Sequence, residues 1–319
     1  MAFFFILFLA TFYAANMGGS SFAGCFAATY GGKIVTHKKA LILFCIFVIL
    51  GSVTFGGNVS RTLGNDIIPA ALFNPKTIAL IFFTGGLGMY IANLMHIPQS
   101  TSLVAVAAIA GVGIQKQALN IATILNFSFF WVLLPLLSFA LTYFVTSRVY
   151  PPRKENFWVY EQIVNREGKL KKFVIFLGCY NAFAIGTNNV PNVVGPLQGE
   201  IPFSLVFQLM IFAVIYGFGG FIFRGPLKTM GDKIVPLGLL TVSIISLITG
   251  TLMLIASALG IPQSFVMLQI GSLFAVSALK HGNELTWENP ITKKTLVTWA
   301  INPLIVFLVT WGLMGLFKL

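Results

Sequence analysis

Long stretches without a charged residue constrain this chain more than any other feature. A spanning helix needs about 20 apolar residues, and only 9% of the chain is charged, against roughly a quarter in a soluble domain. The runs free of Asp, Glu, Lys and Arg are residues 1–32, 40–60, 77–115, 117–147, 173–199, 201–223, 234–279 and 295–317. Most runs have room for one crossing and the longest for two, so the sequence predicts an all-α polytopic membrane protein.

Short motifs occur once in each half of the chain, in the same order. The pairs are HIPQS (96–100) with GIPQS (260–264), GGNVSRTLGNDIIP (56–69) with GGFIFRGPLKTMGDKIVP (219–236), and NMGGSSFAG (16–24) with IGTNNVPN (185–192). The spacings are similar and close to half the chain length. Ordered matches at nearly one spacing predict two related halves.

Basic residues indicate how the two halves are oriented. With the N-terminus outside and five crossings per half, the inside loops hold 16 of the 20 Lys and Arg residues, as the positive-inside rule requires. An odd number of crossings makes the repeats antiparallel, that is, inverted. We predict a first repeat at 1–147, a basic cytoplasmic linker at 148–172 and a second repeat at 173–319, in the cell inner (plasma) membrane. The net charge of +12 then reflects topology, and we expect no nucleic-acid partner.

Several membrane segments contain residues that disfavour an uninterrupted helix. The stretch FAIGTNNVPNVVGPL (183–197) holds three Asn, two Pro and two Gly. Together with 16–24 and the two IPQS corners, it predicts broken helices or re-entrant hairpins near the membrane midplane. Freed backbone groups are tolerated there only where they line a cavity or a ligand. Inverted repeats with such breaks are typical of secondary transporters, whose substrate site lies where the breaks meet.

The second motif, GTNNVPNVVGP, resembles the GANDVANAVGP signature of the PiT family of inorganic phosphate transporters, and IPQSTS (97–102) is similar to the PxSTT hairpin of that family. Asn189 stands where the family signature has Asp, and GSSFAG (19–24) places Ser21 at the other Asp position. With AATYGG (27–32), the chain looks more like the bacterial sulfate permease branch. The resemblance implies two inverted repeats and a tetrahedral oxyanion as the substrate.

The missing carboxylates bear on which oxyanion is carried. All eight acidic residues fall in predicted loops or at the ends of runs. Sulfate at neutral pH only accepts hydrogen bonds, whereas hydrogen phosphate also donates one, and leaving that hydroxyl unpaired costs about 1–3 kcal/mol. We therefore predict a secondary active transporter that imports sulfate by alternating access, with phosphate import on the same scaffold as the alternative. An anion channel is less favoured because the polar residues cluster at paired breaks.

The absence of the two signature aspartates also bears on the coupling ion. The resemblance implies that sodium coupling in the family depends on the signature aspartates. Neutral Asn and carbonyl oxygens bind sodium more weakly, so the sequence favours a proton over sodium as the coupling cation. Besides the oxyanion, this cation and the lipid bilayer, the sequence leaves a homodimer open as an assembly.

Uncharged polar residues at the motifs form the predicted substrate site. They are Ser20, Ser21, Gln99, Ser100, Thr101, Ser102, Asn188, Asn189, Asn192, Gln263 and Ser264. Their hydroxyls and amides offer hydrogen-bond donors to an anion. Structural roles remain open beside this one, since small residues allow helices to approach, hydroxyls cap helices, and the two Gln side chains can seal a hairpin. Arg61 and Arg224 lie at run ends and are assigned to a vestibule or to the membrane interface, and His96 is assigned to the interface.

Enzymatic chemistry is not expected from this sequence. An intramembrane enzyme needs paired carboxylates, a His/Asp pair or a metal cluster at depth, and the charge-free runs contain none. Cys25, Cys45 and Cys179 have no metal-ligand spacing and are interpreted as packing residues. We predict no cofactor and no bound metal.

Overall fold

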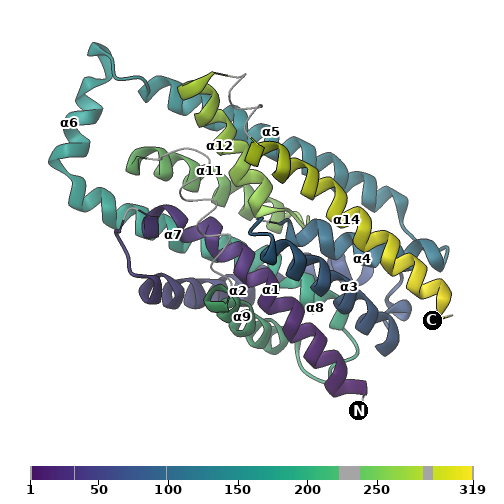
Figure 1. Cartoon of the computed structure of the whole chain (residues 1–319). Helices are drawn as coiled ribbons and strands as arrows, with labels where there is room; N and C mark the ends of the chain where they lie inside the picture. Colours follow the sequence, from purple (N-terminus) through teal and green to yellow (C-terminus); the bar gives the residue numbers. More distant parts are fainter. Residues whose placement is uncertain (1, 32, 98, 223–237, 283–289, 318–319) are drawn as a thin grey trace.

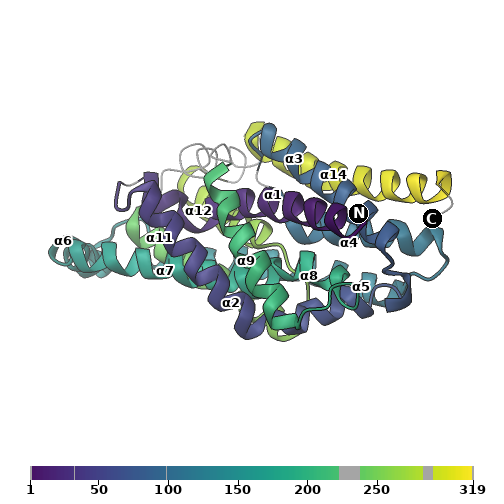
Figure 2. The same ribbon diagram turned by 90° about the horizontal axis from the view of Figure 1, so that it is seen from below.

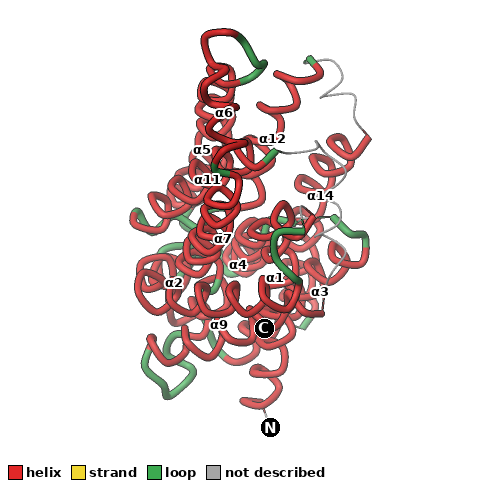
Figure 3. The backbone as a smooth tube through the Cα atoms, turned by 90° about the vertical axis from the view of Figure 1, so that its left-hand side faces the viewer, coloured by secondary structure: helices red, strands yellow, loops and turns green. Residues whose placement is uncertain are grey.

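The computed structural model describes residues 2–31, 33–97, 99–222, 238–282 and 290–317. Within these ranges the backbone is helical, joined by short connections, and contains no strand (Figure 3). Eight helical stretches among the described residues are long and apolar enough to cross a bilayer. The predicted fold class, an all-α polytopic membrane protein, is confirmed.

The helices fall into two series of similar order. The first series is α1 (Ala2–Gly31), α2 (His37–Asn65), a short 3-10 turn η1 (Ala70–Leu72), α3 (Pro75–Leu94), α4 (Thr101–Gln115) and α5 (Ile121–Val149). The linker contains η2 (Lys154–Asn156) and α6 (Phe157–Asn165), and the second series is α7 (Glu167–Asn189), α8 (Pro191–Leu197), α9 (Leu205–Ile222), α11 (Leu239–Ala258), α12 (Phe265–His281) and α14 (Pro290–Leu316). Major packing contacts occur in matched pairs: α1 with α9 and α2 with α7, α4 with α14 and α5 with α12, α1 with α3 and α7 with α11.

Glycines permit the closest of these packings. At Gly18 and Gly219, where α1 crosses α9, and at Gly51 and Gly186, where α2 crosses α7, a methyl group would overlap a backbone carbonyl oxygen of the other helix. Gly18 and Gly186 are separated by 168 residues, as are Gly51 and Gly219. The two crossings are therefore built in the same way from corresponding residues.

Replacing Gly186 by alanine tests this packing. The added methyl would meet the Val48 carbonyl oxygen, and because neither backbone can move freely we expect a loss of about 1–3 kcal/mol of stability. Thermal unfolding in detergent measures it. Gly57→Ala on α2 is the control, because its methyl would meet only a Leu205 side-chain carbon at 3.9 Å and alanine favours a helix. Equal unfolding temperatures for the two variants would contradict the close crossing.

The predicted helix break at 16–24 is wrong. These residues lie inside α1, which is one continuous helix, because the stretch contains no Pro and its glycines serve close approach. The break at 183–197 is present in a mild form. It is confined to Val190, which keeps a helical backbone (φ −59°, ψ −39°) between α7 and Pro191 of α8. Proline at a first helical position removes no helical hydrogen bond, so the chain continues as a second short helix.

The two IPQS corners are true interruptions of matching geometry. His96 and Gly260 adopt left-handed backbone with φ of 56° and 70°, and the next residues, Ile97 and Ile261, donate back to the carbonyls of Ala92 and Ala256. This pattern ends a helix with satisfied carbonyls. The following helices α4 and α12 have only 15 and 17 residues, fewer than the about 20 needed to cross, which fits a hairpin at each corner.

The chain ends and the linker helix α6 lie at opposite ends of the bundle (Figure 1). Helix α1 runs toward the α6 end, while α7 runs back from it (Figure 1). Helices α3 and α14 lie side by side (Figures 1 and 2). An inverted repeat requires such opposed directions, and the repeat boundaries stay a prediction. Arg224 lies outside the described residues.

Candidate functional site

Two of the predicted site residues hold the IPQS corners in place. Ser20 of α1 accepts a hydrogen bond from the Gln99 backbone amide (3.1 Å) and donates one to the Gln99 carbonyl (3.2 Å). Asn188 of α7 accepts from the Gln263 backbone amide (2.8 Å) and donates to the Ile261 carbonyl (2.9 Å). Ser20 and Asn188 therefore perform the same task in the two halves. Their hydrogen-bonding capacity serves the scaffold, and this role was only one of those the sequence left open.

The two corners are joined to each other near the starts of α4 and α12. Ser102 donates to the Gln263 carbonyl oxygen at 3.0 Å, and Asn192 of α8 donates to Ser102 at 3.3 Å. Ser100 and Ser264 cap the two helices, each accepting from the amide three residues on at 3.2 Å. The first amides of each helix still lack an intrahelical partner, so the positive ends of two helix dipoles meet here.

Four buried side chains beside these helix starts carry polar atoms without a hydrogen-bond partner. Neither side-chain atom of Gln99 or Gln263 is paired, and the same holds for Oδ1 of Asn189 and Asn192. All four residues are at most 2% exposed. Leaving a buried polar group unpaired costs about 1–3 kcal/mol, so each such group requires an explanation. We refer to Gln99, Gln263, Asn189 and Asn192 as the amide cluster, whose unpaired polar atoms are available to a ligand.

Ser21 and Asn189, the residues at the two signature aspartate positions, are joined through Tyr216 of α9. Tyr216 Oη donates to Ser21 Oγ at 2.5 Å, and Asn189 Nδ2 reaches Tyr216 Oη at 3.2 Å and Ser21 Oγ at 3.4 Å. Ser21 therefore accepts twice and keeps its own proton for another acceptor. Tyr216 was missed by sequence reasoning. The sequence does mark this residue, because Tyr216 is the single tyrosine in the charge-free run 201–223. It lies just before the glycine pair of GGFIFR (219–224), which repeats GGNVSR (56–61).

Charge is absent from the buried interior of the described residues. The buried polar side chains there are Ser, Thr, Asn and Gln, whereas Asp66, Glu155, Glu161 and Glu167 are exposed. An anion at the cluster would meet amide and hydroxyl donors and two helix starts without a repelling carboxylate. A cation would meet only neutral oxygens.

The structure brings the predicted site residues to one place. All eleven are buried, none more than 2% exposed. Ser20, Asn188, Ser100 and Ser264 act in the scaffold, whereas the amide cluster and Ser21 keep unpaired capacity. Ser102 joins the corners, and Thr101 is buried beside it. Arg61 and His96 are exposed, and their place at the membrane interface stays a prediction.

A family model described as the phosphate transporter family matches residues 17–310. This chain belongs to the phosphate transporter family. The match covers both predicted repeats and confirms the resemblance drawn from the motifs. Members of this family are transporters, so the chain is assigned to multi-pass membrane transporters of inorganic anions.

Individual relatives differ in the anion that their names give. The sulfate permease CysP of Bacillus subtilis is 29% identical over 309 residues, covering 96% of this chain and 85% of CysP. A Methanocaldococcus jannaschii protein provisionally named a phosphate permease is 23% identical, covering 92% and 90% of the two chains. Among solved structures, a sodium-dependent phosphate transporter matches with a TM-score of 0.85 at 18% identity over 99% of both chains. This last likeness establishes the shared fold.

Proposed function

We propose that this chain is a secondary active transporter that imports sulfate by alternating access, with the amide cluster as its binding site. The observation that carries the proposal is the set of unpaired amides at two converging helix starts, in an interior of the described residues that holds no charge. Membership of the transporter family supplies the class of activity. The N-terminus outside, the linker in the cytoplasm and the inner membrane as location belong to the same proposal.

The chemistry of the cluster suits an ion that only accepts hydrogen bonds. Nε2 of Gln99 and Gln263 and the Ser21 hydroxyl are donors without a described partner, and the first amides of α4 and α12 have no acceptor within their own helices. Hydrogen bonds to a charged group contribute about 1.5–3 kcal/mol each, so a few of them offset a large part of the cost of taking a dianion out of water. The similarity to the sulfate permease CysP points the same way.

Phosphate is the second candidate, and one observation favours it. The hydrogen bonds from Nδ2 of Asn189 and Asn192 orient both amides so that Oδ1 is the free atom. These oxygens accept, and hydrogen phosphate has a proton to give them. The same oxygens also suit a coupling cation.

The coupling ion has two candidates for related reasons. The absence of signature aspartates favours a proton over sodium. Sodium is supported by the two free oxygens of Asn189 and Asn192, and no Asp or Glu is buried among the described residues to carry a proton. Separate ion gradients decide between them.

Uptake of labelled sulfate into proteoliposomes containing the purified chain tests the function. We expect uptake that excess unlabelled sulfate abolishes and that excess phosphate reduces far less, because every sulfate oxygen can accept from the free donors of the site, whereas the protonated oxygen of hydrogen phosphate is a weaker acceptor. Proton and sodium gradients imposed separately identify the coupling ion. Liposomes without protein are the control. Phosphate competing as well as sulfate would contradict the sulfate assignment and support phosphate import.

A further inference from the structure

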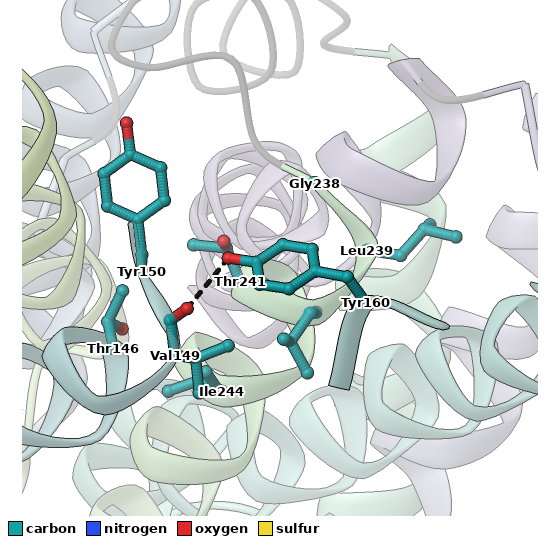
Figure 4. A pocket seen from close by; sticks show the side chains of 9 residues that line it. Thr146, Val149, Tyr150, Tyr160, Gly238, Leu239, Thr241 and Ile244 are labelled. Carbon is teal, nitrogen blue, oxygen red and sulfur yellow. Dashed lines mark hydrogen bonds between the residues drawn. The ribbon is translucent and has the colours of Figure 1, made fainter. Parts of the chain in front are cut away.

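A cavity of about 260 Å³ lies where the end of α5, the linker helix α6 and the start of α11 come together (Figure 4). Thr146 and Val149 of α5, Tyr160 of α6, and Thr241 and Ile244 of α11 line it. It lies at the end of the bundle where the basic linker is found, which the distribution of Lys and Arg places in the cytoplasm. None of the residues that line this cavity belongs to the amide cluster.

Tyr160 closes one side of this cavity. Its hydroxyl donates a hydrogen bond of 2.8 Å to the Val149 carbonyl oxygen, near the end of α5 (Figure 4). The lining also carries a polar group that the protein leaves unused, since the buried Thr146 hydroxyl has no partner. Lys280 of α12 lies 5.8 Å from the ring centre of Tyr150, another lining residue. A basic side chain beside one lining residue and a free hydroxyl on another favour an anion.

Buried polar side chains on α11 connect the cavity region to the amide cluster. Ser243, Ser246, Thr249 and Ser257 lie on the buried face of α11. At the far end Ser257 accepts a hydrogen bond of 3.0 Å from Asn188, which itself holds the second corner. At the near end the helix begins at the cavity lining. Of the cavity-lining residues of α11, Leu239 lies on this buried face, one turn before Ser243, whereas Thr241 and Ile244 lie on the other side of the helix. The buried face of α11 thus leads from Leu239 at the cavity to the corner beside the cluster.

Asn181 of α7 lies midway along this face and is the decisive residue. It is completely buried, and neither its amide nitrogen nor its oxygen has a hydrogen-bond partner. Its Oδ1 is beside Gly250 of α11, where any Cβ would be too close. Asn181 precedes Asn188 by two helical turns, about 10 Å along α7. Helix packing does not explain this side chain, because polar residues that join membrane helices do so by pairing. Ser138, Thr142 and Ser272 do pair in this way, at 2.7 and 2.8 Å.

We propose that α5, α7 and α11 enclose the route by which the oxyanion leaves the amide cluster toward the cytoplasm, with Asn181 as an intermediate contact and the cavity behind Tyr160 as its mouth. The route is closed in this structure, since Ser246, Thr249 and Asn181 are buried. Opening requires α11 to separate from α7, and the free amide of Asn181 then meets the passing anion. The identity of the anion rests on the proposed function, whereas the route itself does not.

Thiol labelling tests the route without any substrate. In a chain with Cys25, Cys45 and Cys179 replaced by serine, Ser246→Cys places a thiol on the route, and Leu247→Cys places one on the outer face of α11, where Leu247 is 51% exposed. We expect a charged, membrane-impermeant thiol reagent on the linker side to modify Ser246→Cys at least tenfold faster, since only a watery route lets the reagent reach an ionised thiol. Equal rates would overturn the route. If Ser246→Cys reacts fast but the protein does not bind sulfate, the route is supported and the assignment of sulfate as the transported anion is contradicted.

Asn181→Leu tests the intermediate contact. We expect the maximum rate of sulfate uptake to fall at least tenfold, while the Kd for sulfate of the purified protein stays within twofold. Thermal unfolding should be unchanged or raised, because an unpaired buried amide is removed, so misfolding can be told apart from slow transport. Asn181→Gln, which keeps the amide, should restore part of the rate. Normal uptake by the leucine variant, or loss of sulfate binding equal to the loss of rate, would overturn this role.

Discussion

Replacing Gln263 by leucine should weaken sulfate binding by about 10- to 100-fold, while the protein becomes no less stable. The side chain of Gln263 is fully buried and both of its polar atoms lack a partner. Leucine has a similar size and leaves no protein group without its hydrogen bond. A hydrogen bond to a charged ligand is worth about 1.5–3 kcal/mol, and each 1.4 kcal/mol is about tenfold in Kd. Titration of the purified protein and thermal unfolding, with Gln99→Leu measured beside it, check both parts.

Asn188→Leu is the matched control for this result. Asn188 is equally buried, but its amide holds the Gln263 and Ile261 backbone and Ser257. Removing it leaves a backbone amide and a carbonyl unpaired, so we expect a clear fall in the unfolding temperature, which Gln263→Leu does not show. If both variants were destabilised alike, Gln263 would be a scaffold residue and the amide cluster would lose its assignment as a binding site.

The membrane helices could be predicted because each crossing leaves its mark directly in the sequence. A charge inside the bilayer is costly, so spans such as Ile121–Val149 are read from a charge-free run, here 117–147, that covers nearly all of the helix. The IPQS corners were also predictable, since a repeated proline between apolar stretches interrupts both. His96 shows the limit of this reasoning. It takes the left-handed backbone that Gly260 takes in the other half, although histidine gives no local sign of it.

The stretch 16–24 was misread because glycine has two meanings in a membrane helix. It can mark a break, or it can let another helix approach closely. Gly18 does the latter, and the residue that decides this lies on α9, almost 200 residues away. No local pattern distinguishes the two cases.

The sequence also does not reveal which polar residues of the site hold the scaffold together and which keep free atoms for a ligand. Ser20 and Gln99 are 79 residues apart, and Ser21 and Tyr216 are 195 apart. Sequence reasoning can name polar residues that a membrane interior must satisfy. It cannot say which of them the protein satisfies itself, and that difference separates Asn188 from Gln263.

Asn189→Asp should abolish most sulfate uptake at neutral pH. At a separation of about 5 Å and an effective dielectric constant of about 20, a carboxylate and a dianion repel by about 7 kcal/mol, more than two hydrogen bonds can return. The amide nitrogen that now donates to Ser21 and Tyr216 is also lost. Their hydroxyls can turn to donate to the new carboxylate, so the fold should survive. We expect uptake at least tenfold below that of the unaltered protein, measured in proteoliposomes at equal protein content.

The pH dependence of this variant separates charge from the loss of the amide. The protonated form of the introduced carboxyl group is neutral like the asparagine it replaces. Uptake by Asn189→Asp should therefore recover at acid pH, where this group is protonated, whereas Asn189→Ala, which also lacks the amide, should stay low throughout. Sodium should stimulate the aspartate variant in the neutral range, because the carboxylate binds sodium as a hard oxygen ligand. The bound cation neutralises the carboxylate, which then no longer repels sulfate. An Asn189→Asp variant that takes up sulfate normally at neutral pH would mean that residue 189 does not face the anion, and the charge-free centre would no longer account for the choice of sulfate.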